Sequence, residues 1–192
     1  MKLKKFLEEH NIEAVLISSK YSLRYFTGFT GTTGIALAFA EKRFFFTDFR
    51  YVTQAKKEVE PNGFTVVKVE RGAVDALAEY IKNSGIKKLG IEDKYVTLAE
   101  YVVYKEKFEG IGFVTLGEAL DKLRMIKTEE ETGYIKKAVE IGDKVFEYIL
   151  DKVKEGAVEK DLAAEMEFQM KKLGGEGPSF ETIIASNYRS AL

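Results

Sequence analysis

The sequence predicts an α/β fold, with a mixed six-stranded sheet and flanking helices, followed by the first helices and strand of an α+β domain. Short apolar runs alternate with helical patterns between residues 13 and 116, which is typical of a sheet with mostly parallel strands. Two of these runs, 35–40 and 44–47, are separated by only three charged residues, which indicates an antiparallel hairpin. Beyond residue 117 the pattern changes to long amphipathic helices.

Each element of the first half follows from local periodicity and turn residues. Leu3, Phe6 and Leu7 fall on one helical face, and Gly85 stands where a helix would end in the left-handed conformation. A loop rich in glycine and threonine is expected at 24–34, before the hairpin. The predicted helices are 2–10, 50–59, 73–83 and 98–108, and the predicted strands are 13–18, 35–40, 44–47, 64–69, 88–92 and 112–116.

The second half is predicted to begin with a connector helix at 118–124. Thr128 and Glu131 then have the spacing of a capping box, so a long helix is expected to start at 129. A second helix is expected without a Ser or Thr N-cap, because Val158 stands at that position. The predicted ranges are 129–154 and 159–173 for these two helices and 180–186 for a strand.

This strand and the two helices lack partners within the sequence. A single strand leaves a row of backbone N–H and C=O groups unpaired, and two apolar helix stripes need a surface to cover. We therefore expect an incomplete second domain, with the chain divided into a domain at 1–117, a linker helix and connection at 118–127, and the start of the second domain at 128–192.

Composition excludes several classes of function. With 30 basic and 31 acidic residues interspersed, the net charge is −1, so nucleic acid is not an expected partner. No apolar run approaches the length of a membrane span, and Glu8 and Glu9 interrupt any signal-peptide core. The absence of cysteine rules out disulfides and fits a cytoplasmic protein.

The residues predict no catalytic or metal site within this chain. His10 is the only histidine, and a single histidine near a helix end is typical of packing rather than of metal binding. The acidic run 129–131 is explained by the helix dipole and by capping. The glycines of 28–34 lack the lysine of a phosphate-binding loop, and no G-x-S-x-G motif is present.

Three phrases of the sequence carry a family resemblance. The first half contains RYFTGFTGTTG at 24–34 and TDFRYVTQA at 47–55, and the chain ends with PSFETIIASNYRSAL at 178–192. The first half resembles the amino-terminal domain of the Xaa-Pro peptidases, aminopeptidase P and prolidase, in the wider pita-bread metallopeptidase and creatinase family. The last phrase resembles the opening of the family's catalytic domain.

The resemblance implies a creatinase-type amino-terminal domain followed by the start of a pita-bread domain. It also implies metal-dependent hydrolysis of X–Pro peptide bonds, with two divalent ions (Mn, Co or Zn) in the full-length parent and short proline-containing peptides as substrates. The metal ligands of the family would follow Leu192, so this chain alone is expected to bind no metal and to be inactive. A homodimer is implied as well.

The resemblance also suggests site residues. Phe180 and Arg189 are candidates for the substrate pocket, with a packing role for Phe180 as the alternative. Arg24, Tyr25 and Phe29 are candidates for an inter-subunit contact or pocket rim, on the expectation that these aromatics are exposed on a loop.

Asp48 and Arg50 belong to the same rim group. They are expected to pair, to cap a helix that begins at Arg50, or to face a partner subunit.

Two alternatives to the peptidase remain at this point. The chain could be a stand-alone, non-catalytic dimerisation or interaction module, or part of a creatinase-like amidinohydrolase. The sequence does not separate an aminopeptidase from a dipeptidase.

Overall fold

A computed structural model describes residues 3–70 and 72–191 of the chain. The chain divides into two compact units, Met1–Ile126 and Lys127–Leu192. They are described separately below and are called unit 1 and unit 2.

Unit 1 contains a six-stranded sheet with the order β4-β3-β2-β1-β5-β6. Its strands are β1 (Ala14–Ile17), β2 (Ile35–Phe39), β3 (Arg43–Asp48), β4 (Thr65–Val69), β5 (Lys88–Ile91) and β6 (Gly112–Thr115). Strand β2 is antiparallel to both β1 and β3, whereas β1 and β5, β3 and β4, and β5 and β6 pair in parallel. The predicted mixed sheet and its hairpin are therefore confirmed.

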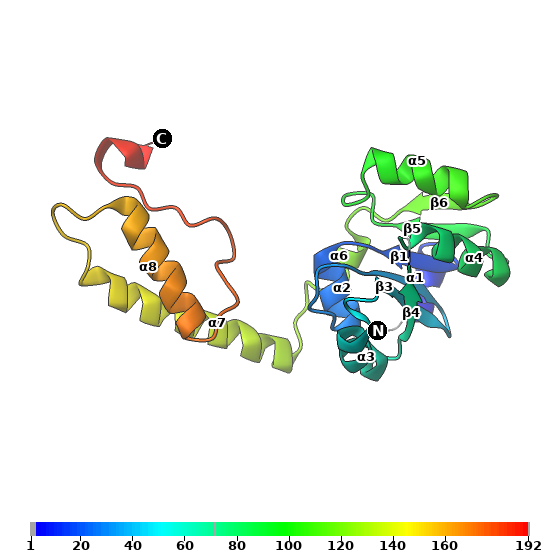
Figure 1. Ribbon diagram of the computed structural model, residues 1–192, viewed down its shortest axis with the longest axis horizontal. Coiled ribbons are helices and arrows are strands. Elements are labelled where there is room, and N and C mark those ends of the chain that lie inside the picture. Colours follow the sequence, from blue (N-terminus) through cyan, green and yellow to red (C-terminus); the bar gives the residue numbers. More distant parts are fainter. Residues whose placement is uncertain (1–2, 71, 192) are drawn as a thin grey trace. The chain divides into compact units, whose positions relative to one another are not determined.

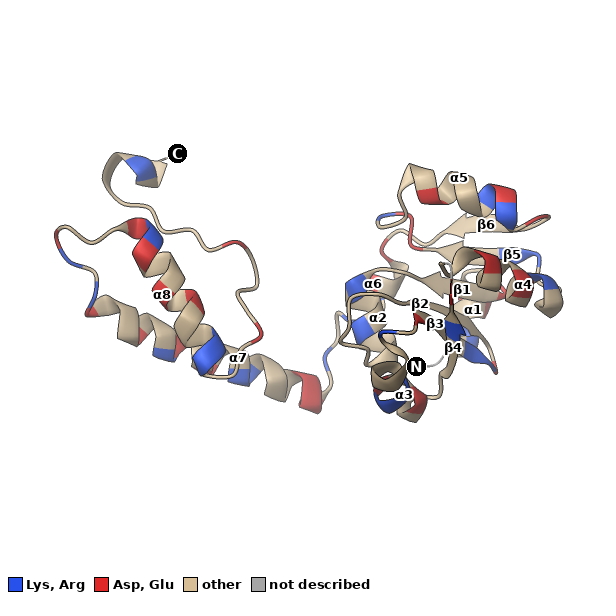
Figure 2. Cartoon of the chain, viewed as in Figure 1, with Lys and Arg blue, Asp and Glu red and all other residues tan. Residues whose placement is uncertain are grey.

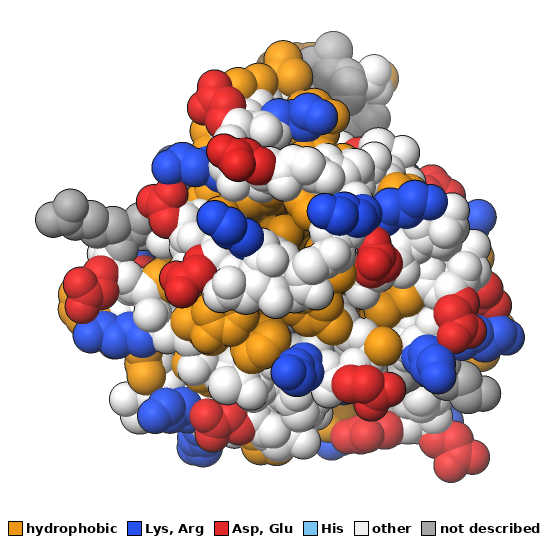
Figure 3. Space-filling view, turned by 90° about the vertical axis from the view of Figure 1, so that its right-hand side faces the viewer, with side chains coloured by type: hydrophobic (Ala, Val, Ile, Leu, Met, Phe, Trp, Pro, Cys, Tyr) orange, Lys and Arg blue, Asp and Glu red, His pale blue; other side chains and the backbone are white. Residues whose placement is uncertain are grey.

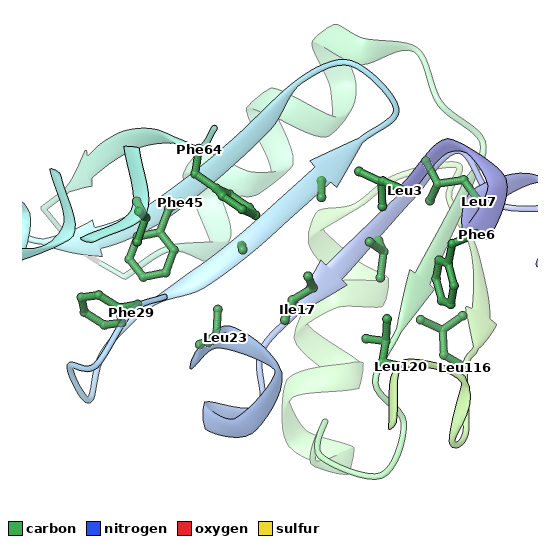
Figure 4. Close-up of a cluster of buried hydrophobic side chains, with 14 of the residues drawn as sticks. Leu3, Phe6, Leu7, Ile17, Leu23, Phe29, Phe45, Phe64, Leu116 and Leu120 are labelled. Atoms are coloured by element: carbon green, nitrogen blue, oxygen red, sulfur yellow. The ribbon is translucent and has the colours of Figure 1, made fainter. Parts of the chain in front are cut away.

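Helices cover both faces of this sheet (Figure 1). They are α1 (Leu3–Glu9), α2 (Lys20–Thr27), α3 (Val52–Val59), α4 (Val74–Ser84), α5 (Leu98–Lys107) and α6 (Ala119–Leu123), with a 3-10 turn η1 at Glu60–Asn62. One buried cluster joins α1, α2, α3 and α6 to one face, and Figure 4 shows Leu23 of α2 and Phe6 of α1 within it. A second cluster joins α4 and α5 to the other face, through residues such as Leu77 and Tyr104.

Alternation along the strands sends neighbouring side chains to opposite faces of the sheet. Val15 and Ile17 of β1 belong to the first cluster, whereas Ala14 and Leu16 belong to the second. All four are essentially inaccessible to solvent, as expected of a strand covered on both faces.

Helix α2 corrects the prediction that residues 24–34 form a loop throughout. The side chain of Ser19 accepts a hydrogen bond from the N–H of Ser22 and so caps the start of the helix. At its end, Gly28 takes a left-handed conformation (φ 78°) and donates its N–H to the carbonyl of Arg24. The loop therefore begins only after Gly28.

Unit 2 consists of two long helices, α7 (Glu129–Leu150) and α8 (Glu159–Lys172), and a 3-10 turn η2 (Asn187–Ala191). The capping box is confirmed, because Thr128 Oγ1 accepts from the N–H of Glu131 while the Glu131 carboxylate accepts from the N–H of Thr128. Val158 forms no side-chain cap, also as predicted.

The predicted strand at 180–186 is wrong. These residues have no regular secondary structure, and the described part of unit 2 contains no strand with which they could pair. A strand exists only through hydrogen bonds to a neighbour, so an apolar run alone does not make one.

Both units carry basic and acidic residues on their helices (Figure 2). Among the helices within residues 3–70 and 72–191, none combines the length and the apolar character that a membrane span requires.

Candidate functional site

The loop between α2 and β2 is held by a buried aromatic cluster. The centroid of the Phe29 ring lies 4.6 Å from that of Phe45 (Figure 4). It lies 5.8 Å from the centroid of the Tyr51 ring. Phe29 is only 2% exposed, so the expectation of an exposed aromatic at this position is wrong. A loop residue can be core when distant elements cover it, and here β3 and the start of α3 do so.

The same cluster leaves no room for a side chain at residue 31, which is glycine. A Cβ atom at Gly31 would lie 2.4 Å from Cζ of Phe29 and 2.9 Å from Cδ1 of Tyr51, well inside van der Waals contact. The loop therefore passes over these rings as bare backbone.

Arg24 and Tyr25 lie on α2 and are exposed, although the structure places them on a helix rather than on the predicted loop. Tyr25 packs edge-on against Phe26, with ring centroids 4.9 Å apart, and its hydroxyl lies 3.5 Å from the carbonyl of Leu123, to which it donates. These two residues thus form part of the surface beside α6.

A polar network fixes the beginning of the same loop. The carboxylate of Glu58 on α3 accepts the N–H and the hydroxyl of Thr30, each at 2.8 Å, and the side-chain amide of Gln54 at 3.1 Å. Burial raises the pKa of Glu58, but the hydrogen bonds from Thr30 and Gln54 outweigh it and leave this pKa below its ordinary value. Nothing local in the sequence links Thr30 to this network, because Thr30 lies 24 residues from Gln54 and 28 residues from Glu58.

Asp48 and Arg50 form an ion pair at the end of β3. Nε of Arg50 donates to Oδ1 of Asp48 at 3.0 Å, and Nη2 donates to Oδ2 at 2.7 Å. The hydrogen bond from the guanidinium lowers the pKa of Asp48 and raises that of Arg50. Helix α3 begins at Val52 with Tyr51 at the N-cap, so the alternative in which this pair caps a helix starting at Arg50 is wrong.

In unit 2 the two pocket candidates lie in different surroundings. Phe180 is 73% exposed in a segment without regular structure, so it is not a core residue of this unit. Arg189 is exposed on η2, and its Nε lies 3.2 Å from Oε2 of Glu159 at the start of α8.

Glu159 organises the approach to η2. Its Oε1 accepts both the N–H and the hydroxyl of Ser186 at 2.7 Å. These hydrogen bonds, with a smaller contribution from the charge of Arg189, lower the pKa of Glu159. Asn187 follows with φ 53°, a left-handed backbone conformation that asparagine tolerates better than most residues.

The described residues do not fit a metal centre. Among residues 3–70 and 72–191, no group of three His, Cys, Asp or Glu side chains could hold a metal ion. His10 packs on Phe6 with ring centroids 4.3 Å apart, and its Nδ1 lies 2.9 Å from the Phe6 carbonyl oxygen. The two-metal site that the family implies therefore has no counterpart among these residues.

A concavity on the surface of unit 1 lies between α4 and the tip of the β2–β3 hairpin. It has a volume of about 580 Å³, and Phe39, Phe44 and Tyr80 form its aromatic lining. Figure 3 shows the side of the molecule that lies to the right in Figure 1, where hydrophobic side chains stand between Lys, Arg, Asp and Glu. The lining carries no recognisable catalytic grouping.

Comparison with protein-family models gives two matches. Residues 1–126 match the creatinase/prolidase N-terminal domain, and residues 133–192 match metallopeptidase family M24.

Curated relatives match along the whole chain. An uncharacterized peptidase, YqhT, from Bacillus subtilis is 37% identical over 191 residues, which cover 100% of this chain and 54% of the relative. The Xaa-Pro dipeptidase from Pyrococcus furiosus is 36% identical, over 100% of this chain and 53% of the relative. The chain thus spans about half the length of the curated relatives it matches.

Solved structures of peptidases are also similar to this chain. The Xaa-Pro dipeptidase from Bacillus anthracis superposes with a TM-score of 0.92 and 37% identity, over 100% of this chain and 53% of that structure. The N-terminal domain of the cytoplasmic peptidase PepQ from Mycobacterium tuberculosis gives a TM-score of 0.58 and 31% identity, over 64% of this chain and 95% of that domain.

Proposed function

The chain belongs to the creatinase/prolidase family, whose N-terminal domain it carries in residues 1–126, and from this membership we propose that it is the amino-terminal part of a metal-dependent peptidase that hydrolyses X–Pro peptide bonds. The observation that carries the proposal is the unbroken similarity of the whole chain to a protein named Xaa-Pro dipeptidase, at 37% identity and a TM-score of 0.92. The match to metallopeptidase family M24 in residues 133–192 supports the same reading.

The exposed face of α7 supports a larger catalytic domain. Ile135, Val139, Phe146 and Leu150 recur at helical spacing on one face, and each is between 48% and 59% exposed. Covering such side chains is worth about 1.5–3 kcal/mol each when their burial is complete. In the proposed enzyme, the remainder of the M24 domain covers this stripe.

In the proposed enzyme, the catalytic residues belong to the remainder of the M24 domain. M24 is a metallopeptidase family, and a pair of divalent ions (Mn, Co or Zn) would supply an activated hydroxide and polarise the scissile carbonyl. Since the described residues do not fit such a site, the 192-residue chain alone is proposed to be inactive.

The proposed roles of this chain are positional. Unit 1 is an accessory domain whose exposed Arg24 and Tyr25, together with the Asp48–Arg50 pair, border a peptide entrance or a partner subunit. Phe29 contributes by holding the loop from beneath.

Phe180 and Arg189 are proposed to line the substrate pocket once the M24 domain is complete. Phe180 has the exposure that such a role needs, and the contact between Arg189 and Glu159 sets where the guanidinium lies. The division at 1–117, 118–127 and 128–192, a homodimeric state and a cytoplasmic location are part of the same proposal. The two alternatives, an isolated interaction module and a creatinase-like amidinohydrolase, gain no support from relatives named as Xaa-Pro peptidases.

The test is hydrolysis by the protein isolated from its natural source and identified by peptides of this chain. An X–Pro dipeptide, an X–Pro–Y tripeptide and the matching X–Ala dipeptide are incubated with Mn²⁺, Co²⁺ or Zn²⁺, and again after chelation. We expect metal-dependent cleavage of the proline peptides only, with the tripeptide separating aminopeptidase from dipeptidase. Equal cleavage of the X–Ala peptide, or X–Pro hydrolysis that survives chelation, would contradict the proposal.

A further inference from the structure

The sheet of unit 1 contains a topological switch point between β1 and β5. These two strands are parallel neighbours, with Leu16 paired to Ile91. After β1 the chain enters α2 on one face of the sheet, and after β5 it continues to α5 on the other face (Figure 1). In open α/β sheets, the crevice at the carboxyl ends of two such strands is where ligands bind.

The side chain of Glu92 lies at the carboxyl ends of these two strands. Glu92 directly follows β5 and is only 3% exposed. Its Oε2 accepts the N–H of Ser18 at 2.7 Å and the N–H of Ser19 at 2.9 Å, while its Oε1 accepts the Ser19 hydroxyl at 3.0 Å. The carboxylate is therefore enclosed by donors from the β1–α2 junction.

These donors belong to the two residues that immediately precede helix α2. Ser19 is the N-cap of the eight-residue helix α2, and the positive end of the helix dipole favours a negative charge at this position. Backbone N–H groups at a helix N-terminus bind carboxylates and phosphates in the same way. All three donors are neutral groups, so the carboxylate satisfies them as a bound anion would rather than as half of a salt bridge.

The junction also holds donors that Glu92 does not use. The hydroxyl groups of Ser18 and Ser22 are buried and have no hydrogen-bond partner, and Ser22 as a whole is inaccessible to solvent. A buried hydroxyl without a partner costs free energy and is uncommon in native structures.

We propose that the start of α2 is an anion site and that Glu92 is its built-in ligand. The carboxylate occupies the place that a free carboxylate or phosphate takes in other open α/β sheets, and it closes the switch-point crevice from within. Removing the side chain opens a site for a small carboxylate such as formate. This inference does not depend on the proposed peptidase activity.

The test is chemical rescue of the Glu92→Ala variant in the full chain. Hydrogen exchange of the Ser18 and Ser19 amides and the thermal midpoint Tm are measured in sodium formate, and in equal concentrations of sodium chloride and of formamide. We expect Tm to fall by roughly 10 °C, since three donors lose their acceptor, and the two amides to lose protection. Formate at about 0.2 M restores amide protection and part of the lost Tm. The Tm rises with formate concentration as expected for a ligand that binds only the folded state.

Two further variants keep the result decisive. Glu79→Ala removes an exposed carboxylate of α4 and serves as the control, which should neither lose Tm nor respond to formate. Glu92→Gln keeps the volume and one acceptor oxygen but lacks the charge, so it should lower the protection of the two amides and leave no room for rescue by formate. Wild-type protection and Tm in both Glu92 variants, or equal rescue by chloride or formamide, would overturn the proposal. If the alanine variant does not fold, the glutamine variant decides by the same criterion of amide protection.

Discussion

The guanidinium of Arg50 holds the carboxylate of Asp48 through two parallel hydrogen bonds, 3.0 Å from Nε to Oδ1 and 2.7 Å from Nη2 to Oδ2. The backbone N–H of Arg50 also donates to Oδ1 at 2.9 Å. These hydrogen bonds lower the pKa of Asp48 in the folded protein.

The pair gives a pH-dependent prediction. Because the folded-state pKa of Asp48 lies below its ordinary value, its contribution to stability is present above the ordinary pKa and is lost as the pH falls through the folded pKa. Arg50→Gln should raise the pKa of Asp48 toward its ordinary value, as followed by the carboxyl chemical shift in an NMR titration. Arg43→Gln is the control, since Arg43 contacts Asn62 instead. An unchanged pKa in the Arg50 variant would show that the ion pair is not formed in solution.

Phe29→Ala should destabilise unit 1. The ring is buried against Phe45 and Tyr51, and truncation of a buried phenylalanine costs roughly 3–5 kcal/mol in the free energy of unfolding. Tyr25→Ala removes a ring that is 39% exposed and should cost about 1 kcal/mol or less. Urea unfolding of the two variants compares them directly, and similar losses would contradict the burial of Phe29.

Gly31→Ala should also destabilise the loop. The added methyl group would meet Phe29 and Tyr51 at less than 3 Å, and overpacking of this kind costs about 1–3 kcal/mol. At Gly112 the nearest atom to an added Cβ is the carbonyl oxygen of Lys87 at 3.4 Å, so Gly112→Ala is the matched control. A thermal midpoint in Gly31→Ala equal to that of the control would mean that the loop can lift away from the rings.

Substitutions at the N-caps of α7 and α8 should change the free energy of unfolding in opposite directions. Thr128→Ala removes the hydroxyl that accepts from the N–H of Glu131, leaves the backbone bond from residue 128 to the Glu131 carboxylate, and should cost about 1 kcal/mol. Val158 occupies the N-cap of α8 with extended backbone angles and no cap bond, so Val158→Ser should stabilise by about 0.5–1 kcal/mol. Helix content followed by circular dichroism during thermal unfolding measures both, and a loss of stability in Val158→Ser would contradict the assigned cap position.

The sequence predicts the sheet of unit 1 because its strands and helices have strong local periodicity. Helix α2 was missed because residues 24–27, its last turn, were grouped with the glycine- and threonine-rich loop that follows Gly28. The burial of Phe29 depends on Phe45, which no local pattern links to it. Glu92 could not be found from spacing, because its donors are 73 and 74 residues away.

The wrong strand at 180–186 has a different origin. Its apolar pattern is present, but secondary structure of this kind requires a neighbouring strand, and the described residues of unit 2 provide none. In the proposed enzyme, the remainder of the M24 domain would supply that neighbour.

Native mass spectrometry of the protein from its natural source tests the central claim most directly, because one spectrum gives both the chain mass and the bound metal. The account predicts a chain well above the 21.7 kDa of this sequence, carrying divalent metal ions that chelation removes together with X–Pro hydrolysis. A metal-free chain of 21.7 kDa would contradict it.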